Sequence, residues 1–284
     1  MSLVPPSSLS PSKVSAFKDC ALAFRFSAID HLPEPPSEPA TKGTLVHLAL
    51  EHLFERPAPD RTVEAALIDL DRAAAEMRAH PDFADLALDA AAEAEFFAEA
   101  EVLVRRYFEL EDPRAVHPIG LELKLEARIG DLRLRGIIDR LELDDDGELV
   151  VTDYKSGRAP SERYEQGRLG GVHFYSFLCE ELFGKRPAKV QLLYLGDPVA
   201  ITTVPSDQSS RGLRTKVAAI WQAVELACER DDFRPKPGPL CTWCSFRPYC
   251  PAVGGDVALV AAAAAAARTA RAGLEGGGVA VSLA

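Results

Sequence analysis

The chain has 284 residues, of which 47% are hydrophobic and 26% charged, and its formal net charge is −11. This composition is typical of a globular protein whose core needs no disulfides. No apolar run reaches the roughly 18 residues of a membrane-spanning helix. The first residues, MSLVPPSSLSPSK, also lack the basic start and apolar run of a signal peptide. We therefore expect a cytoplasmic protein with no membrane partner.

The negative charge is concentrated in one stretch. Residues 60–112 hold 15 Asp or Glu and 5 Lys or Arg, a local net charge of −10. The rest of the chain is therefore nearly neutral, and a modest basic channel for nucleic acid is not excluded. The acidic stretch is expected to face water.

The first part of the chain is predicted to be helical. Residues 1–11 are rich in Pro and Ser and are expected to be irregular, and a helix is expected from Ser12, its N-cap, to about Ile29. Apolar spacing predicts three more helices, over residues 41–54, 61–79 and 84–111.

Strands follow in series. Alternation of apolar and polar residues predicts three strands, over residues 120–129, 131–143 and 147–155. A helix is expected next, over residues 161–183. Two more strands follow it, over residues 188–196 and 200–205. A last helix, over residues 207–230, precedes a cysteine-rich segment, and residues 253–284 are expected to be a frayed helix or disordered. The fold class is therefore α/β or α+β: a mixed sheet of about five strands with a helical insertion, about residues 40–112, before it.

Charged residues lie at the ends of two strands that are otherwise apolar. Asp139 is near the end of the strand in GIIDR, and Asp153 and Lys155 end the next strand, VVTDYK. Asp153 and Lys155 point to the same face of their strand because side chains alternate. Two carboxylates at a strand end can bind Mg²⁺ or Mn²⁺, and a neighbouring lysine can stabilise a phosphate oxygen. The alternative is a cross-strand ion pair at a sheet edge.

Five segments in this order favour the metal site. They resemble motifs of the PD-(D/E)XK nuclease superfamily. In chain order they are the serine-rich start with the helix LSPSKVSAFKDCALAFRF, then GTLVH, GLELKL, GIIDR and VVTDYKSG. The resemblance is closest to the RecB-family nuclease domain. It extends to the related Cas-four-like nuclease of CRISPR adaptation, which holds an iron–sulfur cluster. It covers roughly residues 9–252, with the catalytic core at about residues 118–230.

The resemblance implies a set of site residues. His47, Asp139 and Asp153 would ligate the metal ion together with the backbone carbonyl of Tyr154, and Lys155 would be the catalytic lysine. Glu122, in GLELKL, corresponds to a glutamate usual in the family.

The helix after the lysine strand departs from the family pattern. The family usually has a glutamine four residues before a tyrosine on this helix. Tyr175 is present in GGVHFYSF, but Gly171 occupies the glutamine position.

Three cysteines are close in sequence. Cys241, Cys244 and Cys250 have the spacing C-x₂-C-x₅-C, and Cys20 is the candidate for a fourth ligand. In a reducing compartment, metal ligation is favoured over disulfides. The resemblance implies that these four residues hold a [4Fe–4S] cluster within the segment 235–252, with structural Zn²⁺ as the alternative.

Candidate DNA contacts combine cations with an aromatic face, as single-stranded DNA binding requires. They are Lys13, Arg25, Arg158, Arg163 and Trp243.

The sequence thus predicts a metal-dependent DNA nuclease, most simply an exonuclease that trims single-stranded ends in DNA repair. A processing subunit of a CRISPR or defence complex, with an integrase partner, is a first alternative. A non-cleaving module that holds DNA or a partner helicase is a second.

Overall fold

The computed structural model describes residues 3–275, except for the side chains of residues 162–170 and 270–275. The chain divides into two compact units. The sheet unit comprises Pro36–Lys216, and the terminal unit comprises Met1–Pro35 with Val217–Ala284. The sequence did not predict this division.

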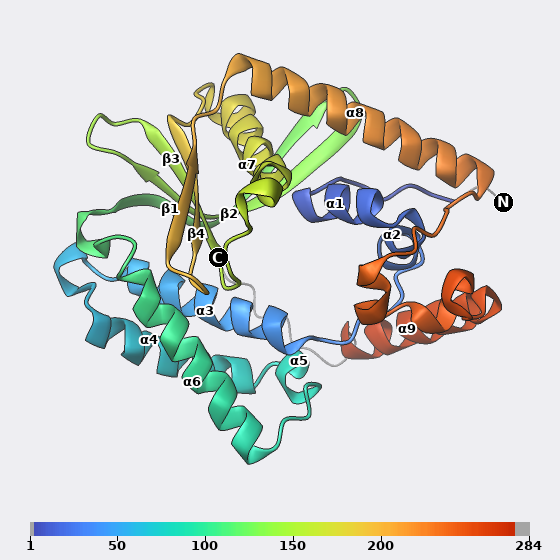
Figure 1. Cartoon of the computed structure of the whole chain (residues 1–284), viewed down its shortest axis with the longest axis horizontal. Coiled ribbons are helices and arrows are strands. Elements are labelled where there is room, and N and C mark those ends of the chain that lie inside the picture. Colours follow the sequence, from blue (N-terminus) through green and yellow to red (C-terminus); the bar gives the residue numbers. More distant parts are fainter. Residues whose placement is uncertain (1–2, 276–284) are drawn as a thin grey trace. The chain divides into compact units, whose positions relative to one another are not determined.

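The sheet unit is built on five strands in the order β1-β2-β3-β4-β5, shown in Figure 1. Their bounds are β1 His117–Ile129, β2 Leu132–Leu143, β3 Leu149–Lys155, β4 Lys189–Tyr194 and β5 Val199–Thr203. Strands β3 and β4 pair in parallel, and the other three neighbouring pairs are antiparallel. The predicted mixed sheet of five strands is confirmed.

Helix α7, Glu162–Phe183, connects the two parallel strands. Parallel neighbours need such a crossover because a tight turn cannot join them. The helix ends at Gly184, whose φ of 65° is the left-handed conformation that a helix C-terminus favours.

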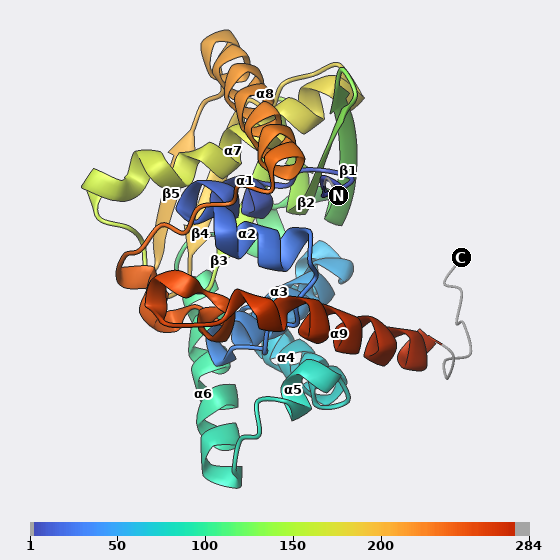
Figure 2. The same cartoon turned by 90° about the vertical axis from the view of Figure 1, so that its right-hand side faces the viewer.

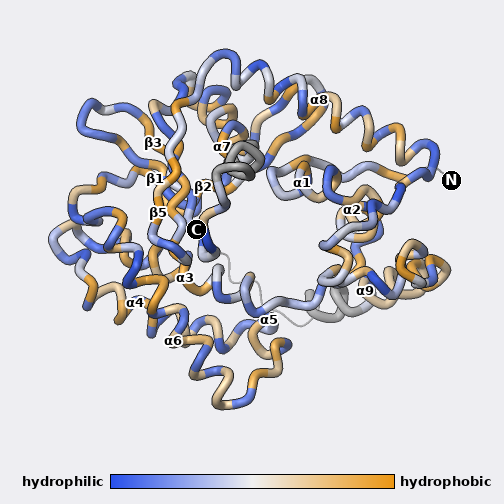
Figure 3. Tube along the Cα trace, viewed as in Figure 1, coloured by the Kyte–Doolittle hydropathy of each residue, from blue (hydrophilic) through white to orange (hydrophobic). Residues whose placement is uncertain are grey.

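The central strands, β3 and β4, are buried on both faces of the sheet. Six of the seven residues of β3 are buried, and so are five of the six residues of β4. Figure 3 shows hydrophobic residues along this part of the sheet. Nearly continuous apolar runs are typical of strands that are buried on both faces.

Four helices precede the sheet and share one core with it. They are α3 Glu38–Glu55, α4 Val63–Arg78, α5 Pro81–Ala84 and α6 Ala90–Tyr107. Their buried residues, including Leu50, Phe96 and Tyr107, form one cluster with Tyr154 and Leu193 of the sheet. The helix predicted over residues 84–111 is shorter than expected because Asp89 caps its start, accepting hydrogen bonds from two backbone N–H groups of the first turn.

The first helix predicted by the sequence is broken in the structure. Residues Pro11–Asp19 form α1 and Ala21–Ala28 form α2, whereas one helix was expected from Ser12 to Ile29. Ser10, not Ser12, caps α1, and its side chain accepts a hydrogen bond from the backbone N–H of Lys13. Cys20 between the helices is extended, with φ −160° and ψ 110°. Cys20 is therefore not part of either helix.

The terminal unit has its own core. Residues of α2 pack with Val224 and Cys228 of α8, Asp207–Arg230, and with Phe246 of the cysteine-rich segment. Figure 2 shows α1, α2 and α9 from a second side.

Part of the tail is helical. Val260–Glu275 form helix α9, and Val260 and Ala264 are buried in the core of the terminal unit. Residues 276–284 lie outside the described part, so the expectation of a frayed or disordered tail stays a prediction for them. Within the described residues, no helix combines the length and apolar character needed to cross a membrane.

Candidate active site

Asp139 and Asp153 meet where the ladder between β2 and β3 ends. The last paired residues are Arg140 and Thr152. Asp139 and Asp153 are one residue beyond this pair, and the Asp139 carboxylate accepts a hydrogen bond from the backbone N–H of Tyr154 at 2.6 Å. Both acids are buried, with 9% of Asp139 and 3% of Asp153 exposed. The two carboxylates that the sequence singled out therefore lie next to each other.

His47 and Glu122 complete a tight group with Asp139. Nδ1 of His47 lies 3.6 Å from Oδ2 of Asp139 and 3.8 Å from Oε1 of Glu122. One ligand atom from each of these three residues lies within 4.8 Å of the others. The residues come from α3, β1 and β2, so tertiary packing assembles the group.

Glu122 has an unusual backbone conformation. Its φ is 43°, in the left-handed region that non-glycine residues rarely adopt. The strand β1 otherwise alternates as predicted from Lys124 onward, with Leu125 and Ala127 buried. Backbone strain of this kind often occurs at functional sites.

The glycine of GTLVH allows α3 to approach the sheet closely. A Cβ atom on Gly43 would lie 3.1 Å from Oγ of Ser156, directly after Lys155. Gly43 is one helical turn before His47, so the two residues lie on the same face of α3. The close approach brings His47 to the end of β3, where its Nε2 is 3.2 Å from the carbonyl oxygen of Tyr154.

The electrostatics of the group favour a bound cation. Burial and the neighbouring Asp153 carboxylate raise the pKa of Asp139 to about 7. Burial lowers the pKa of His47, but Glu122, Asp139 and Asp153 more than offset this and raise it above its usual value. Three acids thus lie around one histidine, and a bound cation would stabilise the ionised form of Asp139.

Lys155 and Tyr175 contact Asp153. The Lys155 ammonium forms an ion pair with the Asp153 carboxylate. Burial lowers the pKa of Lys155, but Asp153 offsets this effect and the net pKa is raised. Burial, followed by Asp153 and Asp139, raises the pKa of Tyr175, which also hydrogen-bonds to Asp153.

These donors fit a hard divalent cation. Carboxylate and carbonyl oxygens are the usual ligands of Mg²⁺ and Mn²⁺, and imidazole is compatible with Mn²⁺. The predicted ligands His47 and Asp139 belong to the tight group, together with Glu122. Asp153 and the Tyr154 carbonyl border it.

Comparison with known proteins decides the family. The model of the PD-(D/E)XK nuclease superfamily matches residues 8–251, which is most of the chain. The chain belongs to this superfamily. By family it is therefore a nuclease, that is, a phosphodiester hydrolase.

Individual relatives are distant. The Gene 69 protein of Mycobacterium phage L5 is 26% identical over 136 residues, which are 46% of this chain and 44% of that protein. The match thus spans less than half of the phage protein. The crystal structure of a candidate exonuclease of Eubacterium rectale aligns with a TM-score of 0.55 at 12% identity, over 84% of this chain and 87% of that chain. This likeness shows a shared fold alone. The structure of SSO0001 aligns with a TM-score of 0.40 at 12% identity, over 87% and 86% of the two chains.

The predicted DNA contacts differ in exposure and in whether they already have a partner. Arg25 is paired with Asp30 and Asp231, so its guanidinium already has two carboxylate partners. The Arg158 side chain is exposed and lies 3.9 Å from Asp197, and Trp243 is 86% exposed. Two further candidates add little: Lys13 donates a hydrogen bond to the Ser8 carbonyl, and the side chain of Arg163 lies outside the described part.

The four predicted cluster cysteines lie in the terminal unit and act on one another. All four are partly buried and free of disulfides. Burial raises the pKa of Cys244, and the thiols of Cys20, Cys250 and Cys241 raise it further. No three of the four sulfur atoms lie within 4.8 Å of one another, however, so the thiols do not form a tight group.

Sequence reasoning missed a buried polar cluster behind the site. It is centred on Arg140, which is fully buried next to Asp139. The available signal was the arginine of GIIDR itself, a charged residue within a run of buried strand positions.

Proposed function

We propose that this protein is a RecB-like, Mg²⁺- or Mn²⁺-dependent deoxyribonuclease that trims single-stranded DNA ends, as in DNA repair. The observation that carries the proposal is the convergence of His47, Glu122 and Asp139 beside Asp153 and Lys155 at the end of the β2–β3 ladder. Buried acids without matching cations are costly, so such a group indicates a bound metal ion.

His47, Asp139 and Asp153 would hold the ion, with Glu122 and the Tyr154 carbonyl as neighbouring oxygen donors. A bound divalent cation lowers the pKa of water and withdraws charge from a phosphate oxygen. Asp139 is oriented for this role because its carboxylate is fixed by the Tyr154 N–H.

Lys155 would stabilise the charge that develops on the phosphate in the transition state. Its ammonium is oriented by Asp153 on the same face of β3. Tyr175 hydrogen-bonds to the same carboxylate from α7 and would restrain it. Gly171 leaves this tyrosine without the glutamine usual in the family.

The hairpin formed by β1 and β2 is a candidate path for the DNA backbone. Lys124, Arg128 and Arg135 are exposed on it, and Arg128 is directly opposite Arg133. Like charges opposite each other destabilise a sheet unless an anion lies nearby. Glu126 on this face pairs with Arg135 at 2.6 Å and lies 3.8 Å from Arg133.

This face begins at the candidate ligand Glu122. At about 3.4 Å per residue, Arg128 lies roughly 20 Å along β1 from Glu122. That distance matches about six base steps of a duplex strand. We therefore add Lys124 and Arg128 to the candidate phosphate contacts.

We propose a [4Fe–4S] cluster at the four cysteines, with Zn²⁺ as the alternative. With Zn–S bonds of about 2.3 Å, the thiolates of a tetrahedral zinc site lie about 3.8 Å apart, whereas no three of these four sulfur atoms lie within 4.8 Å of one another. A cuboidal cluster holds its four cysteines further apart. Backbone N–H groups also point at the sulfurs, since Lys236 donates to Cys20 and Gly238 to Cys241, each at 3.4 Å. Such hydrogen bonds stabilise thiolates at clusters.

The test is cleavage of end-labelled single-stranded DNA with Mn²⁺ by anaerobically purified protein. Wild type should cleave, and Lys155→Ala should reduce the rate at least a hundredfold. Lys185→Ala is the matched control, since the Lys185 side chain is similarly exposed and is paired with Glu148. It should cleave like wild type.

Circular single-stranded DNA in parallel separates exonuclease from endonuclease action, because only an endonuclease cuts a circle. Equal cleavage by wild type and Lys155→Ala would reject the proposed site. A brown, cluster-loaded wild type that binds DNA without cutting it would favour the non-cleaving module.

A further inference from the structure

Tyr154 links both sides of the sheet at the candidate active site. It lies between Asp153 and Lys155 on β3 and is 3% exposed. Its backbone N–H donates to Asp139 at 2.6 Å, and its backbone carbonyl is 3.2 Å from Nε2 of His47. Its ring also packs edge-on against the imidazole, with 5.8 Å between ring centroids. One residue thus touches two candidate metal ligands and is bonded to two further site residues.

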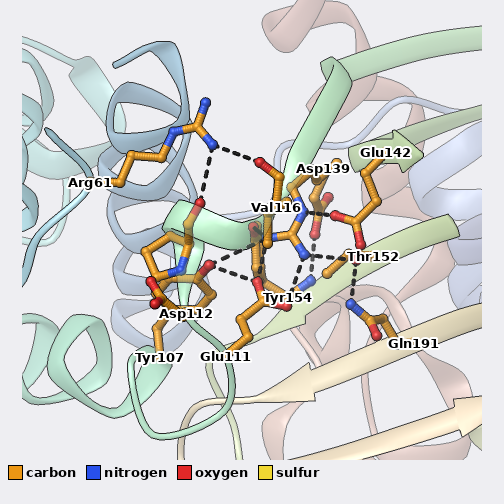
Figure 4. A network of polar contacts seen from close by, with 12 residues as sticks. Arg61, Tyr107, Glu111, Asp112, Val116, Asp139, Glu142, Thr152, Tyr154 and Gln191 are labelled. Carbon is orange, nitrogen blue, oxygen red and sulfur yellow. Dashed lines mark hydrogen bonds and ion pairs between the residues drawn. The ribbon is translucent and has the colours of Figure 1, made fainter. Parts of the chain in front are cut away.

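The side chain of Tyr154 points to the opposite face of the sheet from Asp153 and Lys155, because strand residues alternate. There its hydroxyl accepts a hydrogen bond from Nη1 of Arg140 at 2.8 Å. Figure 4 shows Tyr107, Glu111, Glu142, Thr152 and Tyr154 gathered in this polar network.

Arg140 uses its whole guanidinium in the network. Nη1 and Nη2 bind the two oxygens of Glu111 at 2.5 and 3.0 Å, and Nε binds Glu142 at 2.5 Å. Nη2 also donates to Thr152 Oγ1 at 3.2 Å, and the same hydroxyl accepts from Gln191 of β4 at 2.8 Å. The network therefore ties β2, β3, β4 and the segment after α6 to one fixed cation.

The location of the network is informative. Arg140 and Thr152 are the last paired residues of the β2–β3 ladder, and the site lies directly beyond them. Backbone pairing between these two strands can no longer fix the distance from Asp139 to Asp153 there. The contacts across this gap are the Asp139–Tyr154 hydrogen bond and the bond from Arg140 to the tyrosine hydroxyl.

We propose that Arg140 is a positioning residue, which acts through the Tyr154 hydroxyl to hold Asp139, Asp153 and His47 in the geometry that binds metal. This inference rests on the proposed nuclease function. Buried ion pairs add little net stability compared with apolar residues of the same size, so stability alone does not explain the network. Residues that orient metal ligands, by contrast, typically change metal affinity or activity 10- to 100-fold when altered.

A matched pair of variants tests the inference. Tyr154→Phe removes the hydroxyl that Arg140 binds. Tyr107→Phe removes another buried hydroxyl of the same network, which donates to Glu111 at 2.6 Å and lies 3.4 Å from Arg140. Among the contacts of the described residues, Tyr107 makes no hydrogen bond to Tyr154 or to any other residue of β3. Arg140→Lys is the third variant, because lysine keeps the charge but loses the two-pronged geometry.

The readouts are Mn²⁺ affinity without DNA, measured by electron paramagnetic resonance, together with kcat, KM and melting temperature. We expect Tyr154→Phe to weaken Mn²⁺ binding and lower kcat about 10-fold or more, with KM for DNA unchanged, and Arg140→Lys to do so more strongly. Tyr107→Phe should leave both within about twofold of wild type.

Equal effects of Tyr154→Phe and Tyr107→Phe on stability, with unchanged Mn²⁺ affinity and kcat, would overturn the inference. If Arg140→Lys does not fold, the two tyrosine variants still decide it. A wild type that binds Mn²⁺ but does not cleave DNA would reject the proposed function instead. The Mn²⁺ affinities of the variants would then still confirm or reject the positioning role.

Discussion

Neutralising Asp139 tests the electrostatics of the site directly. Burial and the Asp153 carboxylate raise the pKa of Asp139 from 3.8 to about 7. Between these two values the folded, metal-free protein holds a proton that the unfolded chain has released. Its free energy of unfolding therefore falls as the pH rises from about 4 to about 7. At about 1.4 kcal/mol for each pKa unit, ionised Asp139 costs about 4 kcal/mol above pH 7.

We expect Asp139→Asn to raise the free energy of unfolding of the metal-free protein by about 2–4 kcal/mol at pH 8. Asparagine keeps an oxygen that can accept the Tyr154 N–H, so the hydrogen bond survives. The gain should shrink toward zero near pH 4, where folded wild type is already protonated. The variant should also lose the stabilisation that Mn²⁺ gives wild type at pH 8. The measurement is urea unfolding at both pH values, with EDTA or with Mn²⁺.

Asp69→Asn is the matched control. Asp69 is as buried as the acids of the site, but Arg56 binds both of its oxygens, at 2.6 and 2.8 Å. Its neutralisation should destabilise the protein at pH 8, the opposite sign from Asp139→Asn. If Asp139→Asn destabilises the metal-free protein as Asp69→Asn does, Asp139 is a structural acid and the reasoning is refuted.

Three further predictions address the DNA path, the cluster and the close packing of the site. Lys124→Ala with Arg128→Ala should weaken single-stranded DNA binding and reduce the slope of log affinity against log salt by about 1.4; an unchanged slope would exclude the hairpin as a phosphate contact. Cys241→Ala should yield protein with less iron, less colour and a lower melting temperature, whereas the colour and iron content of wild type would show that this cysteine is not a ligand. Gly196→Ala should destabilise by about 1–3 kcal/mol in urea unfolding, because its Cβ would lie 2.6 Å from backbone atoms of Gly157; wild-type stability would mean that this loop can shift.

Local patterns were enough to predict most of the fold. The strands and long helices could be predicted from the spacing of apolar residues. In β3, β4 and α3 these apolar positions are the buried ones. The break at Cys20 was not predictable, because an extended residue between two helical stretches is fixed by packing in the terminal unit. The packing of α9 was missed for a related reason. Its run of alanines has no contrast between faces, so the sequence could not show that Val260 and Ala264 are buried.

The membership of the candidate site was predictable, but its geometry was not. The resemblance supplied Glu122 and His47, because their motifs occur in order before the two aspartates. It could not show that Glu122 adopts a φ of 43° or that Gly43 lets α3 approach Ser156. Both features depend on how α3 and β1 pack against the end of β3. This packing arises only in the folded sheet unit and cannot be read from any one segment.

The residue between Asp153 and Lys155 shows why a motif read by its side chains is incomplete. Alternation sends the Tyr154 side chain away from the site, so its identity carries no weight when the motif is judged by the residues that face the metal. Its backbone, however, contacts Asp139 and His47 directly. A side chain anchored on Arg140 thus restrains backbone atoms that act on the opposite face. Through its side chain Tyr154 thus connects the buried network with backbone atoms at the site, and a hydrogen bond at its hydroxyl is therefore expected to influence metal binding without touching the metal.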